Sequence, residues 1–139
     1  MRSLLFAAAI AALAAGSAHA ETLKFHAMLN GASEVPANTE KGTGMAMATL
    51  DTATKAFTYD ITYSGLTGPA TAAHFHGPAA PGANAGPTVP LSPAASPIKG
   101  TATLTDAQIA DLVAGKWYVN VHSMAHPGGE LRGQVMAMK

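Results

Sequence analysis

Residues 55–63 read KAFTYDITY, and large apolar side chains alternate with polar ones along the whole segment. Successive side chains of a β-strand point to opposite faces, so Phe57, Tyr59, Ile61 and Tyr63 would share one face. Aromatic and β-branched residues are also the residues that strands favour. The segment therefore predicts a strand with one buried and one exposed face, as is common in antiparallel sheets.

The same type of pattern recurs on both sides of this segment, with turn residues between the repeats. We expect further strands over residues 22–29, 42–50, 70–76, 98–104, 117–122 and 130–138. Many short strands separated by turn signals are typical of a sandwich or barrel. The pattern predicts an all-β fold, an antiparallel Greek-key-like β-sandwich.

Two segments depart from the strand pattern. Residues 105–114 predict one short helix, because Thr105 and Gln108 have the spacing of a capping box and Gly115 follows as a stop. Residues 77–97 are rich in Pro, Gly, Ala and Ser, and we expect a long loop with at most a short strand near residues 88–91. Loops of this length in a compact domain are often functional.

The first twenty residues predict a signal peptide of bacterial style. Arg2 precedes an apolar run over residues 4–15, and Ala18-His19-Ala20 has the small-x-small pattern of a cleavage site. We therefore expect residues 21–139 to form one domain of a periplasmic or secreted protein. No second apolar segment approaches the ~20 residues of a membrane helix, so no membrane span is expected in the mature chain.

Composition argues against several function classes. The chain has eight basic and eight acidic residues and no cysteine, so neither a disulfide nor a thiolate ligand is available. No basic patch suggests a nucleic-acid partner. No phosphate-binding loop and no Ser/His/Asp arrangement is visible, and we expect a protein without enzymatic activity.

Four of the six histidines lie in two short segments. His74 and His76 are two residues apart on an expected strand and would share a face. His122 ends another strand, and Met124 and His126 follow it. Imidazole suits copper and zinc, and thioether is a soft ligand for Cu(I). We predict a metal site with His74, His76 and His122 as core ligands and His126 and Met124 as additions, with copper as first choice and zinc as second.

The site requires the imidazole nitrogens to converge within roughly 3 to 4 Å, because metal–nitrogen bonds are ~2.0–2.1 Å long. Glu34 or water could complete the ligand shell. In the alternative interpretation His74 and His76 are structural, and hydrogen-bond the loop that begins at Gly77.

Other candidates have simpler interpretations. Met45 and Met47 are expected to fill the core or a sheet edge, because methionine fits irregular gaps. Glu130 and Arg132 are expected to pair with each other or with a neighbouring strand. His26 faces away from the apolar side of its strand and is expected to be exposed.

Several motifs occur in a characteristic order along the chain: Leu29-Asn30-Gly31-Ala32-Ser33-Glu34-Val35-Pro36, Ala73-His74-Phe75-His76-Gly77-Pro78, Ala114-Gly115-Lys116-Trp117-Tyr118-Val119-Asn120-Val121-His122-Ser123 and Gly129-Glu130-Leu131-Arg132-Gly133-Gln134. In this order they resemble the CHRD domain, named after chordin and also found in single-domain exported bacterial proteins. The resemblance covers nearly all of residues 21–139 and implies an all-β sandwich. His74, His76 and His122 stand where the family pattern also carries histidine.

The resemblance implies little about activity, since chordin binds secreted growth factors and the bacterial members have no general assigned reaction. Our leading hypothesis is an exported CHRD-domain protein that binds a transition metal for storage, buffering or delivery. The alternative is a non-enzymatic interaction module that uses residues 77–97 to bind an envelope or secreted protein partner. A redox enzyme is a third hypothesis and would need an open coordination position.

Overall fold

The computed structural model describes residues 19–139, so most of the expected signal peptide, residues 1–18, lies outside the described residues. The described chain forms one helix and nine strands. The helix is α1 (Asp106–Val113). The strands are β1 (Thr22–Asn30), β2 (Thr43–Asp51), β3 (Ala56–Ser64), β4 (Ala70–His76), β5 (Pro87–Pro90), β6 (Ile98–Thr103), β7 (Tyr118–Ser123), β8 (Leu131–Gln134) and β9 (Met136–Ala137).

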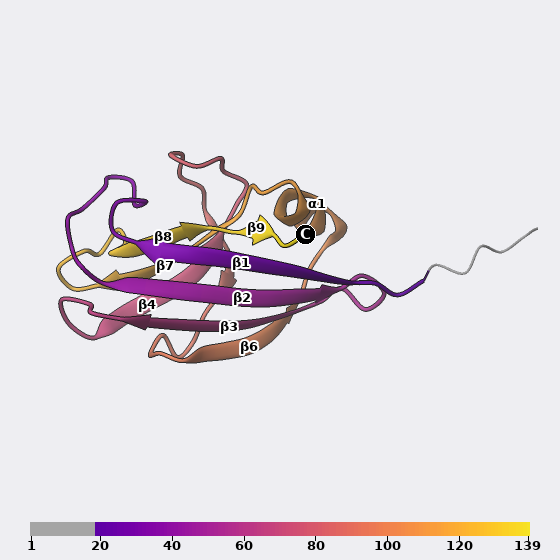
Figure 1. Ribbon diagram of the computed structural model, residues 1–139, viewed down its shortest axis with the longest axis horizontal. Coiled ribbons are helices and arrows are strands. Elements are labelled where there is room, and N and C mark those ends of the chain that lie inside the picture. Colours follow the sequence, from indigo (N-terminus) through magenta and orange to yellow (C-terminus); the bar gives the residue numbers. More distant parts are fainter. Residues whose placement is uncertain (1–18) are drawn as a thin grey trace, which may run out of the picture.

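The strands form one antiparallel sheet that folds over on itself. Its order is β5-β4-β7-β8-β1-β2-β3-β6, and β9 pairs with β1. Between β8 and β1 the ladder is short: one pair of residues, Asn30 and Arg132, lies in register there. Figure 1 shows β1, β2, β3 and β6 side by side, with β4, β7 and β8 in a second layer behind them. The all-β prediction is confirmed, and the sandwich is a nearly closed, barrel-like sheet.

The backbones of β8 and β1 approach each other closely at Gly133. A Cβ atom at this position would collide with the backbone carbonyl oxygen of Met28 in β1. Glycine lets β8 lie directly against β1, because it has no side chain to separate the two backbones.

The core lies between the two layers and centres on Phe57. Its ring contacts those of Phe25, Phe75 and Trp117, at centroid distances of 6.4, 5.2 and 5.7 Å. All four side chains are fully buried. Edge-to-face aromatic contacts of this kind are favourable beyond the area that they bury.

The helix forms where the capping signals predict it. The Thr105 hydroxyl accepts a hydrogen bond from the backbone N–H of Gln108, and the Gln108 side chain accepts one from the backbone N–H of Thr105. Gly115 follows the helix with a φ of 74°, a conformation that favours glycine. The described residues include no helix long and apolar enough to cross a membrane.

Two expectations need correction. The last strand, expected over 130–138, breaks at Val135, because β8 pairs with β7 in one layer whereas β9 pairs with β1 in the other. Met45 and Met47 do not fill the core: both lie on the outer face of β2 and are about two-fifths exposed.

Candidate metal centre

The antiparallel pairing of β4 with β7 brings three histidines together. His74 lies opposite Asn120, and His122 lies opposite Ala72. Because side chains alternate along β4, Phe75 points into the core while His74 and His76 point to the outer face. The outer face of these two strands therefore carries all three predicted core ligands.

The three imidazoles converge, although only the pair His74 and His122 is shown to meet the separation of roughly 3 to 4 Å that the metal-site prediction requires. One nitrogen from each of His74, His76 and His122 lies within 4.8 Å of the other two. The separation between His74 Nδ1 and His122 Nε2 is 3.3 Å. The cluster is partly buried, with His76 the deepest of the three.

Backbone carbonyls fix the orientation of two of the rings. His76 Nδ1 lies 2.9 Å from Ala85 O, and His122 Nδ1 lies 2.8 Å from Pro127 O. A carbonyl oxygen accepts and never donates, so Nδ1 carries the proton and Nε2 of the neutral ring keeps a lone pair. Histidine ligands in metal sites commonly donate their second N–H to a backbone carbonyl in this way.

The free Nε2 atoms face Asn120. Its Oδ1 atom lies 2.9 Å from His76 Nε2 and 3.0 Å from His122 Nε2. When Nδ1 of each ring carries its proton, these three atoms are acceptors, and His74 Nδ1 can donate to His122 Nε2 but not to the other two. A bound cation satisfies them, as does an amide turned so that its two N–H groups donate to the two rings. The donor set therefore fits a metal ion.

Burial keeps the histidines in the form that can bind a metal. Burial lowers the pKa of His74 below its usual value, and the neighbouring His122 and His76 add to the effect. Burial also lowers the pKa of His76, although hydrogen bonds with Ala85 and Asn120 act in the opposite direction. Both rings are therefore neutral near pH 7, and a neutral imidazole offers the lone pair that a metal needs.

The side chains of Tyr118 and Arg132 stack against the ring of His76. The Tyr118 ring lies parallel to the His76 ring, with centroids 4.7 Å apart and planes 1° apart. The Arg132 guanidinium carbon lies 3.5 Å from the centroid of the Tyr118 ring, a cation–π contact. Arg132 also donates hydrogen bonds to Ala83 O and Asn84 Oδ1, so the stack holds the loop over the site.

Sequence reasoning missed this stack. It treated Arg132 as a strand residue that pairs with Glu130 or with a neighbouring strand, whereas Arg132 is fully buried and binds the loop. The alternation of Tyr118, Asn120 and His122 along one strand was the available signal, because it places all three on one face.

Glu130 has a separate structural role. Its buried carboxylate accepts hydrogen bonds from the Thr67 backbone N–H, the Thr67 hydroxyl and the Ser123 hydroxyl. Burial alone would raise the pKa of Glu130, but these hydrogen bonds outweigh burial and lower it. Glu130 thus fastens the loop after β3 to the end of β7.

The other predicted site residues lie outside the three-histidine cluster. His126 Nε2 is 3.1 Å from Glu40 Oε1, and Met124 is 86% exposed. Glu34 is buried, its Oε1 has no hydrogen-bond partner among the described residues, and burial raises its pKa to about 7. The structure thus brings together His74, His76 and His122, with Asn120 as an additional polar group.

Comparison with known proteins gives a family. The family model of the CHRD domain matches residues 25–135, a range that includes the three histidines and Asn120. No curated protein and no solved structure matches the chain.

Proposed function

This chain belongs to the CHRD-domain family, and we propose that it is an exported, non-enzymatic domain that binds one transition-metal ion through His74, His76 and His122. The proposal places the protein in the periplasm or outside the cell, since the CHRD domain is an extracellular module and the N-terminal segment has the pattern of a signal peptide.

The observation that carries the proposal is the convergence of three imidazole nitrogens, two of them on rings that backbone carbonyls orient. His76 and His122 each use Nδ1 to bind a backbone carbonyl, which leaves Nε2 for a ligand. His74 contributes the third nitrogen from the same strand as His76. A purely structural role would use the histidines as separate hydrogen-bonding groups and would not require the three to meet.

Copper is the first choice of metal and zinc the second. Nitrogen ligands suit both ions, and affinity for divalent ions generally rises to a maximum at Cu(II) in the first transition series. The cluster in the described residues contains imidazoles and no carboxylate. We propose storage, buffering or delivery of the ion as the role of the site.

The test is titration of the mature protein with Cu(II). Calorimetry measures the affinity and the number of ions bound, and electron paramagnetic resonance identifies the ligand atoms. We expect one ion per chain with nitrogen ligands. His74→Ala should weaken binding by at least about tenfold, as loss of a ligand costs no less than loss of a supporting residue. His74 is preferred to His76 because its ring is hydrogen-bonded to His122 of the cluster, whereas the His76 ring also binds Ala85 O in the loop.

His126→Ala is the matched control, because this histidine is bonded to Glu40 outside the cluster. We expect it to bind Cu(II) as the unmodified protein does. Equal binding by all three proteins, or no binding beyond weak surface association, would contradict the proposal.

A further inference from the structure

The methionines of this protein are distributed in an unusual way. Six lie in the described residues, and all of them are at least two-fifths exposed: Met28, Met45, Met47, Met124, Met136 and Met138. Methionine is among the residues most often buried in proteins. Here the core contains none of the six, so their exposure needs an explanation other than packing.

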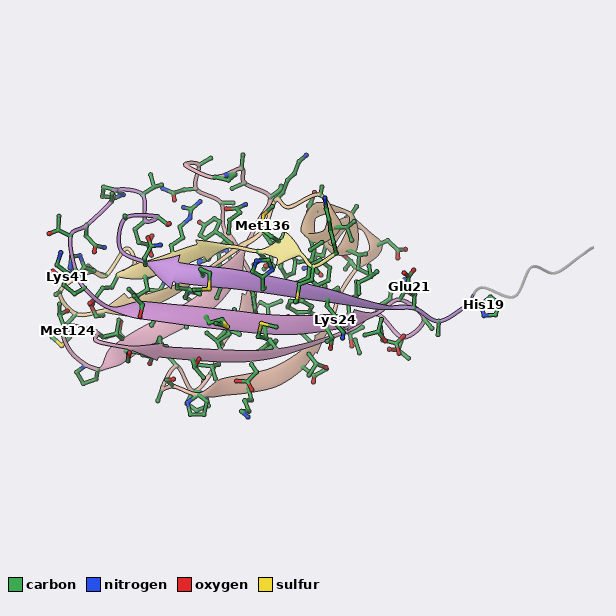
Figure 2. The ribbon with its side chains drawn as sticks, viewed as in Figure 1. His19, Glu21, Lys24, Lys41, Met124 and Met136 are labelled. Carbon is green, nitrogen blue, oxygen red and sulfur yellow. The ribbon has the colours of Figure 1, made fainter. Side chains whose placement is uncertain are left out.

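Strand register gathers three of these methionines beside one histidine. On the outer face of β1 and β2, His26 lies opposite Met47, and Met28 lies opposite Met45 in the next row. On its other side His26 pairs in register with Met136 of β9, but the Met136 sulfur lies toward Gly115 at the end of α1. Directly opposed residues have Cβ atoms about 4.5–5.5 Å apart, so the side chains of the pairs across β1 and β2 meet. Figure 2 shows sulfur atoms over β1 and β2, Met136 above them toward α1, and Met124 at the far end of the molecule.

The histidine at the centre has an unused nitrogen. His26 Nδ1 is buried and has no hydrogen-bond partner among the described residues, and its ring is partly buried rather than exposed as expected. A buried polar atom without a partner is costly and uncommon in folded proteins. An imidazole nitrogen left free beside several thioethers has the composition of a metal site.

We propose that His26, Met28, Met45 and Met47 form a second metal site, which binds Cu(I). Thioether sulfur is a soft ligand that selects Cu(I) over hard ions, and imidazole suits copper as well. In an exported protein without cysteine, methionine is the sulfur ligand that remains. The site lies on the outer face of the β1–β2 layer, whereas the three-histidine centre lies on the outer face of β4 and β7, so the two proposals stand independently.

The edge of this site carries charged side chains. Asp60 of β3 lies opposite Met47 and forms an ion pair with Lys99 at 3.1 Å. Lys24 precedes His26 by two residues on the same strand face. Because Lys99 already pairs with Asp60 and Lys24 is itself a cation, we expect Zn²⁺ and Ca²⁺, which prefer nitrogen or oxygen ligands, to bind weakly there.

The test is an anaerobic titration with Cu(I) in competition with a coloured Cu(I) chelator. The double variant Met45→Leu/Met47→Leu keeps the apolar volume and removes two sulfurs, so it should remain folded. We expect its Cu(I) affinity to fall at least tenfold. X-ray absorption of the Cu(I)-loaded protein should show sulfur neighbours that decrease in this variant. Met124→Leu, which removes a sulfur outside the site, should bind Cu(I) as before.

A second variant separates this site from the histidine centre. In His74→Ala/His122→Ala, Cu(I) binding with sulfur neighbours should persist even where Cu(II) binding is lost. His26→Ala should weaken Cu(I) binding and leave Cu(II) binding at the other face unchanged. The proposal would be overturned if Met45→Leu/Met47→Leu bound Cu(I) as tightly as the unmodified protein, or if the loaded protein showed no sulfur neighbours.

Discussion

Asn120 illustrates how one side chain can organise a site. Its amide oxygen meets Nε2 of both His76 and His122, and a hydrogen bond from its side chain also lowers the pKa of Glu34. Only burial, the largest influence, raises the pKa of that carboxyl group to about 7. Asn120 therefore lies between the three-histidine cluster and Glu34, a buried acid outside that cluster.

Glu34 makes folding stability depend on pH in a direction that can be checked. Its pKa is about 7 in the folded protein against 4.5 for an unperturbed glutamate, so the folded state binds more protons between these two pH values. The free energy of unfolding should therefore fall as pH rises through this range. Glu34→Gln removes the buried charge and should stabilise the protein at pH 8 by about 2–3 kcal/mol.

Urea unfolding of both proteins at pH 5 and pH 8 measures this effect. The advantage of the glutamine variant should be small at pH 5, where the glutamate is mostly protonated when folded. A difference that is the same at both pH values would show that charge is not its cause.

At the level of single residues, the sequence predicted the histidines better than their surroundings. His74, His76 and His122 could be found because strand alternation fixes which face a side chain occupies. The contact of Arg132 with Tyr118 could not, because it depends on the register of β7 against β8, which places Arg132 opposite Asn120. The free nitrogen of His26 depends likewise on neighbours in β2 and β9 that are distant in sequence.

At the level of elements, local signals located most strands and the helix. β4 was predicted with the observed ends, and the helix followed from Thr105, Gln108 and Gly115. The break at Val135 was not predicted, because alternation describes the faces of a strand and carries no information about its partners. Val135 itself stays buried, and its N–H donates to Trp117 O at the point where the chain changes layer.

The cap of α1 provides a test at this scale. Thr105→Ala removes the hydroxyl that accepts the hydrogen bond from the Gln108 backbone N–H. Loss of such a cap typically destabilises a protein by about 1 kcal/mol, and we expect that decrease in the free energy of unfolding in urea. Thr71→Ala, at an exposed position of β4, serves as the comparison and should cost less. Equal losses in the two variants would argue against a capping role.

At the level of the whole molecule, Phe57 ties the two layers together. Its ring contacts Phe25 of β1 in one layer and Phe75 of β4 in the other. Removal of a buried aromatic ring leaves a cavity, and Phe57→Ala should cost about 3–5 kcal/mol of unfolding free energy. That is a large part of the 5–15 kcal/mol typical of a domain.

Thermal and urea unfolding of Phe57→Ala check this expectation. A single cooperative transition at lower temperature is expected, because both layers depend on the same ring. Separate transitions for the two layers, or a loss below about 1 kcal/mol, would contradict the role given to Phe57.

The exposure of all six described methionines has a consequence for chemical damage. Peroxide converts thioether to sulfoxide, a polar group that would disrupt a core that contained it. Here the core is built from aromatic and aliphatic side chains, so the fold would survive oxidation that removes the soft sulfur ligands from the β1–β2 face. Oxidative stress would thereby release ions from one face of an intact molecule, and enzymatic reduction of the sulfoxides would restore that face without refolding.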